Sequence, residues 1–387
     1  MMQLAICGKS NCGKTTFFSA ATLVDAEISN RIFTTIKPNM GVSYVRVKCP
    51  CKELGVQCNP QNSTCISGQR FVPVKMIDIA GLVPGAHEGR GLGNAFLTDI
   101  MTANALIHVV DISGSTDKDG NPVALGTNNP EQDIEFLEKE IDYWMLGIIK
   151  KAWPQVQKKT GERIEDMLYR QLSGLMVSLN TVKYLIEKNG ISPKSSEEEL
   201  LSFITELRAE NKPIIIAANK IDVAGADKLY EKIRGSGAIP CCAEAELALR
   251  RATEKGLVRY LPGDEDFEII GRLDEKQLKG MEFVHSIMKK YNGTGVQKVI
   301  NSAVFDLLGM IVVYPVENES RYSDKKGNAL PDALLLPGSS NAKDLAYAIH
   351  EDIGNKFISA TDCRTGQRIG AEHELKNGDI VSIKAGR

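Results

Sequence analysis

Short apolar runs alternate with longer segments of helical periodicity along most of the chain. The strand-like runs lie at residues 3–7, about 42–48, 71–78, 105–111 and 213–218, with a brief one before Cys242. Continuous apolar character over such lengths is typical of strands buried on both faces. Because helical segments separate these runs, we expect an α/β fold with a doubly wound, mostly parallel sheet.

Helical periodicity dominates the middle of the chain. One apolar stripe contains Ile134, Leu137, Ile141, Met145 and Ile148, and a second contains Leu168, Leu172, Leu175, Leu179, Val182 and Ile186. Residues 196–199 resemble a capping box that starts another helix. The stripes predict a helical bundle lying on the sheet domain, and a groove for a partner is the alternative. Residues 115–130 are rich in Gly, Asn and Pro and predict a linker.

The C-terminal part of the chain has a different pattern. Its strand-like runs lie at 311–315, 333–338, 356–360 and 378–383, and turn residues separate them. One helix is expected from Ala342 to about Ile353. This order predicts a small mixed sheet that grips a single helix.

Composition narrows the class of protein. The 387 residues carry a net charge of −2, with 43% hydrophobic and 25% charged residues, as in ordinary globular proteins. The chain as a whole is not strongly basic, so it lacks a general electrostatic attraction for nucleic acid, and any RNA contact must be local. No apolar run is long enough to cross a membrane, and the first residues predict a core strand, which argues against a cleavable signal. The nine cysteines are expected to be reduced, as in a cytoplasmic protein. We also expect the protein to be a monomer.

The most informative motif is a G-x-x-x-x-G-K-T phosphate loop between a predicted strand and a predicted helix. Its residues are Gly8, Lys9, Ser10, Asn11, Cys12, Gly13, Lys14 and Thr15, and Thr16 continues into the helix. Backbone N–H groups of such a turn hold phosphate oxygens, and the helix N-terminus adds positive potential. We expect Lys14 to reach the terminal phosphates and the Thr15 hydroxyl to bind Mg²⁺. The alternative is a Gly-rich turn that matches by chance.

Further motifs complete the pattern of a nucleotide switch. The apolar run before Asp78 ends in D-x-x-G, where Asp78 is expected to hold Mg²⁺ through water and the Gly81 N–H to sense the γ-phosphate. Upstream, residues 33–36 supply hydroxyls, and Thr35 is expected to close over Mg²⁺.

The sequence Asn-Lys-Ile-Asp at residues 219–222 predicts which base is bound. A carboxylate at Asp222 accepts hydrogen bonds from N1–H and the exocyclic amine of guanine, and adenine offers neither donor there. Asn219 is expected to brace the base-binding loop, and the stem of Lys220 to cover the ring. GTP is therefore the expected ligand.

Three classes of function stay open at this point. The first is a GTP-hydrolysing switch, the second a nucleotide-gated binding module whose turnover is incidental, and the third a P-loop kinase for a small metabolite. Asp222, the D-x-x-G strand and the lack of a second-substrate lid argue against the kinase.

Four cysteines cluster between the two predicted switch segments. Cys49, Cys51, Cys58 and Cys65 have the spacing C-x-C-x₆-C-x₆-C, which could form a tetrahedral Zn²⁺ site. Reduced thiols on a β-hairpin are one alternative, and disulfides in a hyperthermophile are another. The other five, Cys7, Cys12, Cys241, Cys242 and Cys363, are predicted to fill core or loop positions.

With these motifs in view, the chain resembles the Obg-related GTPases and, within them, an archaeal YchF-like branch. Residues 77–94 match the switch II of that group, and residues 33–39 match its switch I. Residues 336–338, 344–350 and 378–381 resemble a TGS domain, a β-grasp module found in ribosome- and tRNA-associated proteins. The resemblance therefore implies a cytoplasmic GTPase with a ribosome or RNA partner.

The same resemblance implies a division into parts. The expected domains are a G domain at 1–125 and 206–300 with a cysteine-containing hairpin at 44–73, a helical insertion at 126–205 and a TGS-like domain at 305–387. The insertion and the TGS-like domain are the expected contacts for the ribosome or RNA.

Two departures from the family pattern bear on the base. Many YchF-like members carry Asn-x-x-Glu and accept ATP, whereas Asp222 here favours guanine. The base-binding loop of the family usually ends in Ser-Ala-Glu or Ser-Ala-Lys, and Cys242-Ala243-Glu244 stands there in this chain. The contact implied is from the Ala243 backbone N–H to guanine O6, so cysteine in place of serine should matter little.

Hydrolysis is expected to be slow. Leu82 follows Gly81 where Ras-like enzymes carry a water-orienting Gln, and leucine cannot polarise water. His87 is a candidate for orienting water, or serves switch geometry only. Asn11 is a candidate ligand for K⁺, as in some related GTPases, or is simply a small polar loop residue.

Overall fold

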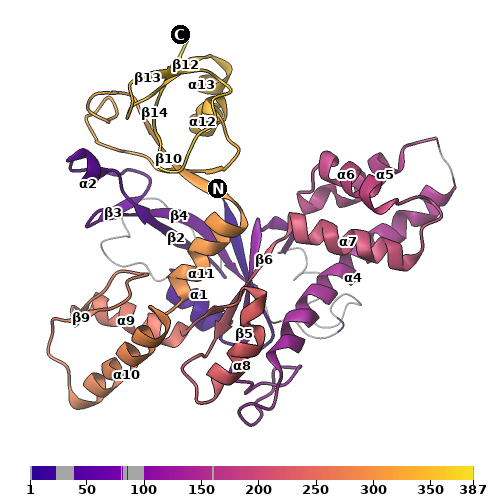
Figure 1. Cartoon of the computed structure of the whole chain (residues 1–387), viewed down its shortest axis with the longest axis horizontal. Coiled ribbons are helices and arrows are strands. Elements are labelled where there is room, and N and C mark those ends of the chain that lie inside the picture. Colours follow the sequence, from indigo (N-terminus) through magenta and orange to yellow (C-terminus); the bar gives the residue numbers. More distant parts are fainter. Residues whose placement is uncertain are drawn as a thin grey trace.

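The computed structural model describes residues 2–22, 39–79, 81, 85, 100–158 and 161–386. Figure 1 shows a central sheet flanked by helices, an arm of helices on one side and a small C-terminal domain above the sheet. The expected α/β architecture with a helical insertion and a C-terminal β-grasp-like domain is therefore confirmed.

The main sheet has seven strands in the order β2-β4-β1-β5-β6-β7, and β3 pairs with β4. Their bounds are β1 Gln3–Cys7, β2 Met40–Lys48, β3 Thr64–Ile66, β4 Gln69–Asp78, β5 Ala105–Asp111, β6 Ile214–Asn219 and β7 Ile239–Pro240. The neighbouring pairs β4–β1, β1–β5, β5–β6 and β6–β7 are parallel, and β2 and β3 run antiparallel to β4. Every predicted strand of this region is present.

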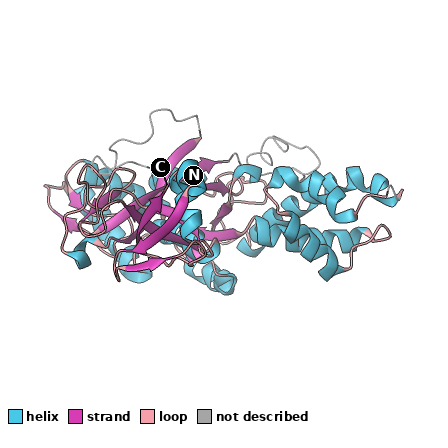
Figure 2. Cartoon of the chain, turned by 90° about the horizontal axis from the view of Figure 1, so that it is seen from above, coloured by secondary structure: helices cyan, strands magenta, loops and turns pink. Residues whose placement is uncertain are grey.

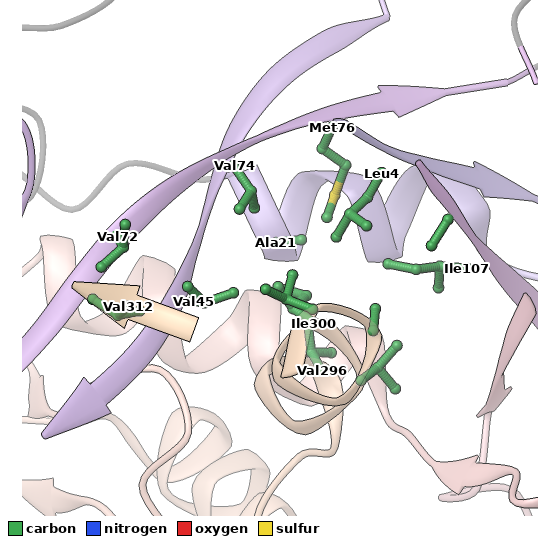
Figure 3. Packing of buried hydrophobic residues seen from close by; sticks show 14 of the residues in the cluster. Leu4, Ala21, Val45, Val72, Val74, Met76, Ile107, Val296, Ile300 and Val312 are labelled. Carbon is green, nitrogen blue, oxygen red and sulfur yellow. The ribbon is translucent and has the colours of Figure 1, made fainter. Parts of the chain in front are cut away.

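Alternation along β1 explains how both faces of the sheet are covered. Leu4 and Ile6 point to a core shared with α1 (Lys14–Thr22) and α11 (Val296–Ser302), as Figure 3 shows for Leu4 beside Ala21 and Ile300. Ala5 belongs to the opposite core, which includes residues of the helical arm. A strand buried on both faces reads as a continuous apolar run, so the sequence could locate it.

The helical arm contains α4 (Pro130–Gln157), α5 (Ile164–Leu172), α6 (Leu179–Asn189) and α7 (Glu197–Asn211). Figure 2 shows these helices extending away from the sheet. The capping box predicted at 196–199 is present, and α7 runs across the boundary expected near 205. The stripe from Leu168 to Ile186 is not one helix, because the chain passes through a left-handed Met176 and restarts at the N-cap Ser178.

The C-terminal domain is a five-stranded mixed sheet in the order β11-β10-β14-β12-β13. The strands are β10 Met310–Val316, β11 Leu334–Pro337, β12 Phe357–Asp362, β13 Gln367–Ile369 and β14 Ile380–Ala385. The single helix expected here is two, α12 (Ala342–Ile349) and α13 (Glu351–Asn355). His350 has an extended backbone and caps the second helix through its ring, which explains the break.

The remaining elements connect these parts. They are α2 Cys51–Leu54, α8 Ala226–Ile233, α9 Ala243–Glu254, α10 Glu275–Tyr291, the strands β8 Val258–Arg259 and β9 Glu268–Ile269, and, among the described residues, three short turns of 3-10 or π type. Among the helices described, none combines the length and apolar character that crossing a membrane requires.

Candidate functional site

The phosphate loop follows β1 and turns sharply into α1. Gly8 has a φ of +142°, and a Cβ there would lie 2.4 Å from the carbonyl oxygen of Val109 on β5. Gly13 has a φ of +96°, and its Cβ would lie 2.3 Å from the Asn219 side-chain nitrogen. Both glycines are therefore required by backbone conformation and by close approach to neighbouring strands.

The D-x-x-G segment meets the phosphate loop at its lysine. Lys14 is buried, and its Nζ donates to the carbonyl oxygen of Lys9 at 2.7 Å. A Cβ added to Gly81 would lie 3.4 Å from that Nζ and 2.6 Å from the Ser10 hydroxyl. The structure thus brings together Lys14 and Gly81, the two groups predicted to sense the terminal phosphate.

The two described Mg²⁺-binding candidates face each other across the end of β4. The Thr15 hydroxyl donates to Asp78 Oδ2 at 3.3 Å, and Asp78 Oδ1 is buried without a hydrogen-bond partner among the described residues. Burial raises the pKa of Asp78, and the nearby Lys14 opposes that shift. An orphaned carboxylate oxygen beside a hydroxyl fits a hard cation that prefers oxygen ligands.

Asn219 ties together the loops at the predicted base-binding end of the site. Its side-chain nitrogen donates to the Cys12 carbonyl at 3.0 Å, and its oxygen accepts from the Ala243 N–H at 3.1 Å. Lys220 has a φ of +65°, and its Nζ donates to the Asn11 carbonyl at 2.8 Å. One loop after β6 therefore holds the phosphate loop and the start of α9 in fixed positions.

Asp222 and Cys242 lie next to each other on this edge. Asp222 is half-buried, and Cys242 is buried and accepts from the Ala245 N–H at 3.4 Å as the N-cap of α9. Burial raises the pKa of the Cys242 thiol, and Asp222 contributes to the shift. The Ala243 N–H is bonded to Asn219 in this structure, so its role toward guanine O6 stays a prediction.

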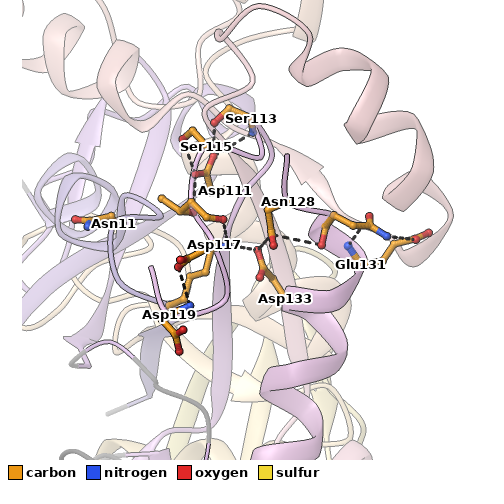
Figure 4. Close-up of polar contacts among 12 residues, drawn as sticks. Asn11, Asp111, Ser113, Ser115, Asp117, Asp119, Asn128, Glu131 and Asp133 are labelled. Carbon is orange, nitrogen blue, oxygen red and sulfur yellow. Dashed lines mark hydrogen bonds and ion pairs between the residues drawn. The ribbon is translucent and has the colours of Figure 1, made fainter. Parts of the chain in front are cut away.

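The segment predicted as a linker at 115–130 is instead folded over the phosphate loop. Thr116 and Pro122 form a β-bridge, and the Asn11 side chain donates to the Gly120 carbonyl at 3.0 Å. Figure 4 shows Ser115 at the start of this segment bonded to Asp111. Composition suggested a linker because Gly, Asn and Pro favour turns, but these turns are tied down by side-chain hydrogen bonds. K⁺ binding by Asn11 stays a prediction.

Asp111, which belongs to none of the predicted motifs, anchors that segment. Its carboxylate accepts from the hydroxyls of Ser113, Ser115 and Thr116 and pairs with Lys220 Nζ at 3.0 Å. Burial opposes ionisation, but hydrogen bonds from Ser113 and Lys220 hold the pKa of Asp111 below its ordinary value. An acidic residue at the carboxyl end of a buried parallel strand was the available signal.

The first helix of the arm contacts both the phosphate loop and the segment predicted as the second switch. Lys9 Nζ forms a buried ion pair of 2.7 Å with Asp133 of α4 and donates to the Thr116 carbonyl at 2.8 Å. Two turns further along α4, Glu140 accepts from the Gly85 N–H at 2.9 Å. Spacing of seven residues places Asp133 and Glu140 on one face of the helix. No motif in the sequence connects residues so far apart.

His108 is a buried histidine beneath the phosphate loop. It lies on β5, pairs in register with Cys7, and its Nδ1 has no hydrogen-bond partner among the described residues. Burial lowers its pKa to about 3, and the charges of Lys14 and Lys9 add to that effect. The ring is therefore neutral near pH 7.

Two predicted residues lie outside the described part of the chain. These are Thr35 in the first switch segment and His87 in the second. Their roles remain predictions. Ser10 and Thr16 lie in the described phosphate loop and at the start of α1, as predicted.

The four clustered cysteines converge. All nine cysteines of the chain are free thiols, and the Sγ atoms of Cys49, Cys51, Cys58 and Cys65 all lie within 4.8 Å of one another. The other cysteines are buried in cores or loops, as predicted.

Comparison with known proteins agrees with this geometry. Residues 3–151 match the family described as 50S ribosome-binding GTPase, residues 217–318 the G4 motif-containing domain of the Obg-like, YGR210-like GTPases, and residues 322–385 the TGS domain. An uncharacterized GTP-binding protein of Methanocaldococcus jannaschii is 48% identical over 99% of both chains. The chain belongs to the Obg-like GTPases of the YchF-like branch.

Two further relatives of this YchF-like protein are informative. The crystal structure of a GTP-binding protein from Pyrococcus horikoshii is 38% identical, covers 100% of both chains and gives a TM-score of 0.80. The ribosome-binding ATPase YchF of Bacillus subtilis is 26% identical over 98% of both chains. The second name states a different nucleotide, so the family alone does not decide between GTP and ATP.

Proposed function

We propose that this protein is a Mg²⁺-dependent GTPase that hydrolyses GTP slowly and acts as a conformational switch on the ribosome or an RNA partner. The observation that carries the proposal is Asn219, which joins the phosphate loop to the base-binding loop through two buried hydrogen bonds. A nucleotide bound across this bridge contacts both loops at once. Proximity of Lys14, Thr15, Asp78 and Gly81 supplies the phosphate-binding end.

Guanine selectivity rests on Asp222. A carboxylate accepts from the two adjacent donors of guanine, whereas adenine presents a lone pair and no amine on that edge. The half-buried position of Asp222 beside Cys242 limits competition from water. This supports GTP over ATP, which the name of the Bacillus subtilis relative states instead.

Thr15 and Asp78, with Thr35, are the residues that would hold Mg²⁺. The bound ion would neutralise charge on the phosphate oxygens. Lys14 and the N–H groups of the loop hold the phosphates, and Gly81 lies beside Lys14, where its N–H would report a third phosphate.

Slow hydrolysis follows from Leu82, which has no group that orients water. His87 is the candidate for that task, and an unchanged rate in His87→Ala would remove it.

The route from nucleotide to partner runs through α4. Lys9 of the phosphate loop and Gly85 of the second switch segment bind Asp133 and Glu140 on one face of this helix. A nucleotide that moves either segment therefore changes the contacts of the arm. Hydrogen exchange along α4, compared between GDP and a non-hydrolysable GTP analogue, tests this route directly.

A ribosome or RNA partner is supported by the TGS domain and by the names of relatives, not by charge. The net charge of −2 argues for shape-specific docking. Co-sedimentation with ribosomes in the presence of GDP or a GTP analogue is the test. Equal recovery in both states would contradict a switch.

Calorimetry with GTP, ATP and xanthosine triphosphate decides the base. The unaltered protein should bind GTP at least 100-fold more tightly than ATP. Asp222→Asn should lose GTP and gain xanthosine triphosphate, because an amide donates to the C2 carbonyl that xanthine carries in place of the amine. Asp227→Asn, an exposed change on α8, is the matched control. Equal binding of ATP and GTP would overturn the assignment.

A further inference from the structure

The four thiols of the cysteine cluster lie close enough together to bind a single metal ion. The Sγ atoms of Cys51 and Cys65 lie 3.8 Å apart, those of Cys49 and Cys58 lie 3.9 Å apart, and all four lie within 4.8 Å of one another. An ion with bonds of ~2.3 Å to sulfur holds its ligands about 3.8 Å apart in a tetrahedron. A disulfide would need sulfur atoms about 2.05 Å apart.

The cluster gathers residues from separate elements. Cys49 follows β2, Cys51 begins the short helix α2, Cys58 lies in the loop after it, and Cys65 lies on β3. Between Cys49 and Gly68, only Cys49 and Cys51 are fully buried apolar side chains. A segment with so little core of its own is usually held by a metal or a disulfide.

Arg70 supplies a second, independent observation. It is 0% exposed and pairs in register with Cys65 between β3 and β4. Its guanidinium donates to the Ser63 hydroxyl and the Leu330 carbonyl and stacks over the ring of Tyr314 at 5.4 Å. Its Nε has no partner, and no ion pair of 4.0 Å or less joins Arg70 to a carboxylate in the described ranges, where the nearby carboxylate is that of Asp332, whose pKa burial raises and the charge of Arg70 lowers. A buried cation with neutral partners is costly unless an anion lies nearby.

A tetrathiolate metal centre would provide that anion. Four thiolates around one divalent ion carry a net charge of −2, and sulfur ligands in a tetrahedron select zinc or iron. Both the thiol geometry and the buried guanidinium therefore point to the same bound species.

The cysteine hairpin, residues 49–68, is also the joint to the C-terminal domain. The N–H groups of Asn59 and Gln61 donate to the carbonyls of Ala329 and Pro331 at 2.9 and 2.6 Å. Asn62 exchanges two side-chain hydrogen bonds with the backbone of Ala333. Figure 1 shows α2 and β3 directly beneath the C-terminal domain.

We propose that Cys49, Cys51, Cys58 and Cys65 bind one Zn²⁺ ion, and that this ion holds the cysteine hairpin in the shape that docks the C-terminal domain. The site is separate from the nucleotide site, so zinc binding does not depend on the proposed GTPase activity. Loss of the ion frees the hairpin and loosens the docked domain.

Metal analysis of the full-length, tag-free protein is the first test. One zinc per chain is expected, and Cys58→Ser should lose at least nine-tenths of it because a thiolate ligand is gone. Cys241→Ser, a buried thiol outside the cluster, should keep it. Retention of zinc by Cys58→Ser, or iron in its place, would overturn the assignment.

Cobalt titration covers the case in which Cys58→Ser fails to fold. The chelated wild-type chain should take up one Co²⁺ with the intense visible bands of a tetrahedral tetrathiolate, and zinc should displace it. Absence of these bands would contradict the site. Loss of four hydrogens by intact mass would show two disulfides instead and would also overturn it.

Hydrogen exchange tests the joint itself. In the chelated protein, the Asn59 and Gln61 amides should exchange at least tenfold faster than in the zinc-loaded protein, while amides of β5 should not change. Readdition of zinc should restore the slow rates. A zinc-free chain with unchanged exchange at both amides would refute the docking role.

Discussion

The base-binding edge and the cysteine hairpin are both built from polar side chains, but different partners hold them. At the base edge, Asn219 is 3% exposed, and its side-chain amide forms hydrogen bonds with the backbone of two other segments. In the hairpin, the four thiols approach chiefly one another. A buried polar group that is satisfied by backbone is preorganised without a ligand, whereas groups that face one another depend on one. The two regions should therefore respond differently to mutation, acid and metal removal.

The largest expected effect is at the base edge. Asn219→Ala removes two buried hydrogen bonds, each with a cost of about 1–3 kcal/mol when one partner is left unsatisfied. Affinity for GDP should fall roughly 100-fold or more by calorimetry. Asn211→Ala, whose amide donates to the Leu175 carbonyl in the arm, should leave the affinity unchanged. A change of less than threefold in Asn219→Ala would show that the ligand, not Asn219, orders this edge.

Acid should weaken the sheet below the phosphate loop before the rest. The unfolded chain protonates His108 below about pH 6.5, whereas burial keeps the folded pKa at about 3. The contribution of the neutral His108 ring to the free energy of unfolding is therefore fully present above pH 6.5 and is lost as the pH falls toward 3. The loss amounts to about 3 kcal/mol between pH 7 and 4. Chemical denaturation across that range should be flatter for His108→Gln. His373→Gln, an exposed change, should follow the unaltered protein, and identical slopes in all three would refute the role of His108.

Arg70 distinguishes the two regions further, because its contribution to the free energy of unfolding should depend on whether zinc is bound. In zinc-loaded protein, Arg70→Met should lower the free energy of unfolding by about 2 kcal/mol, since the thiolate centre loses its buried counter-charge. In chelated protein the same change should be close to neutral. Arg364→Met, which breaks an exposed pair with Glu53 at the same joint, should cost about 0–1 kcal/mol in both states. If Arg70→Met lowered the free energy of unfolding equally with and without metal, Arg70 would not be a counter-charge to the thiolate centre.

The smallest effect concerns the cation at Asn11. If Asn11 gives up its bond to the Gly120 carbonyl and binds K⁺, hydrolysis should be a few-fold faster in KCl than in NaCl, a difference of about 1 kcal/mol. Asn11→Ala should remove the difference. Phosphate release measured in both salts decides the point, and equal rates in the unaltered protein end the hypothesis.

Much of the fold was visible in the sequence because the relevant signals are local. The strands of the main sheet are continuous apolar runs, and the start of α7 is a capping box within four residues. Breaks in regular structure were harder to see. The Leu168–Ile186 stripe keeps helical spacing through Met176, although the backbone there is left-handed. Periodicity records which residues face the core, not whether the chain between them stays helical.

The candidate site divides in the same way. By itself the sequence predicted the phosphate loop, Asp78, Asn219 and Asp222 as parts of the site, because backbone cradling, metal binding and base recognition need fixed residue types at short spacing. Tertiary structure alone decided that Asp111 ties down residues 113–116, that Asp133 neutralises Lys9, and that Arg70 pairs in register with Cys65 of the cysteine cluster. These pairings join residues brought together by sheet order and helix packing. The physical reason is that a buried charge accepts any suitable partner in reach, and only the fold decides which partner that is.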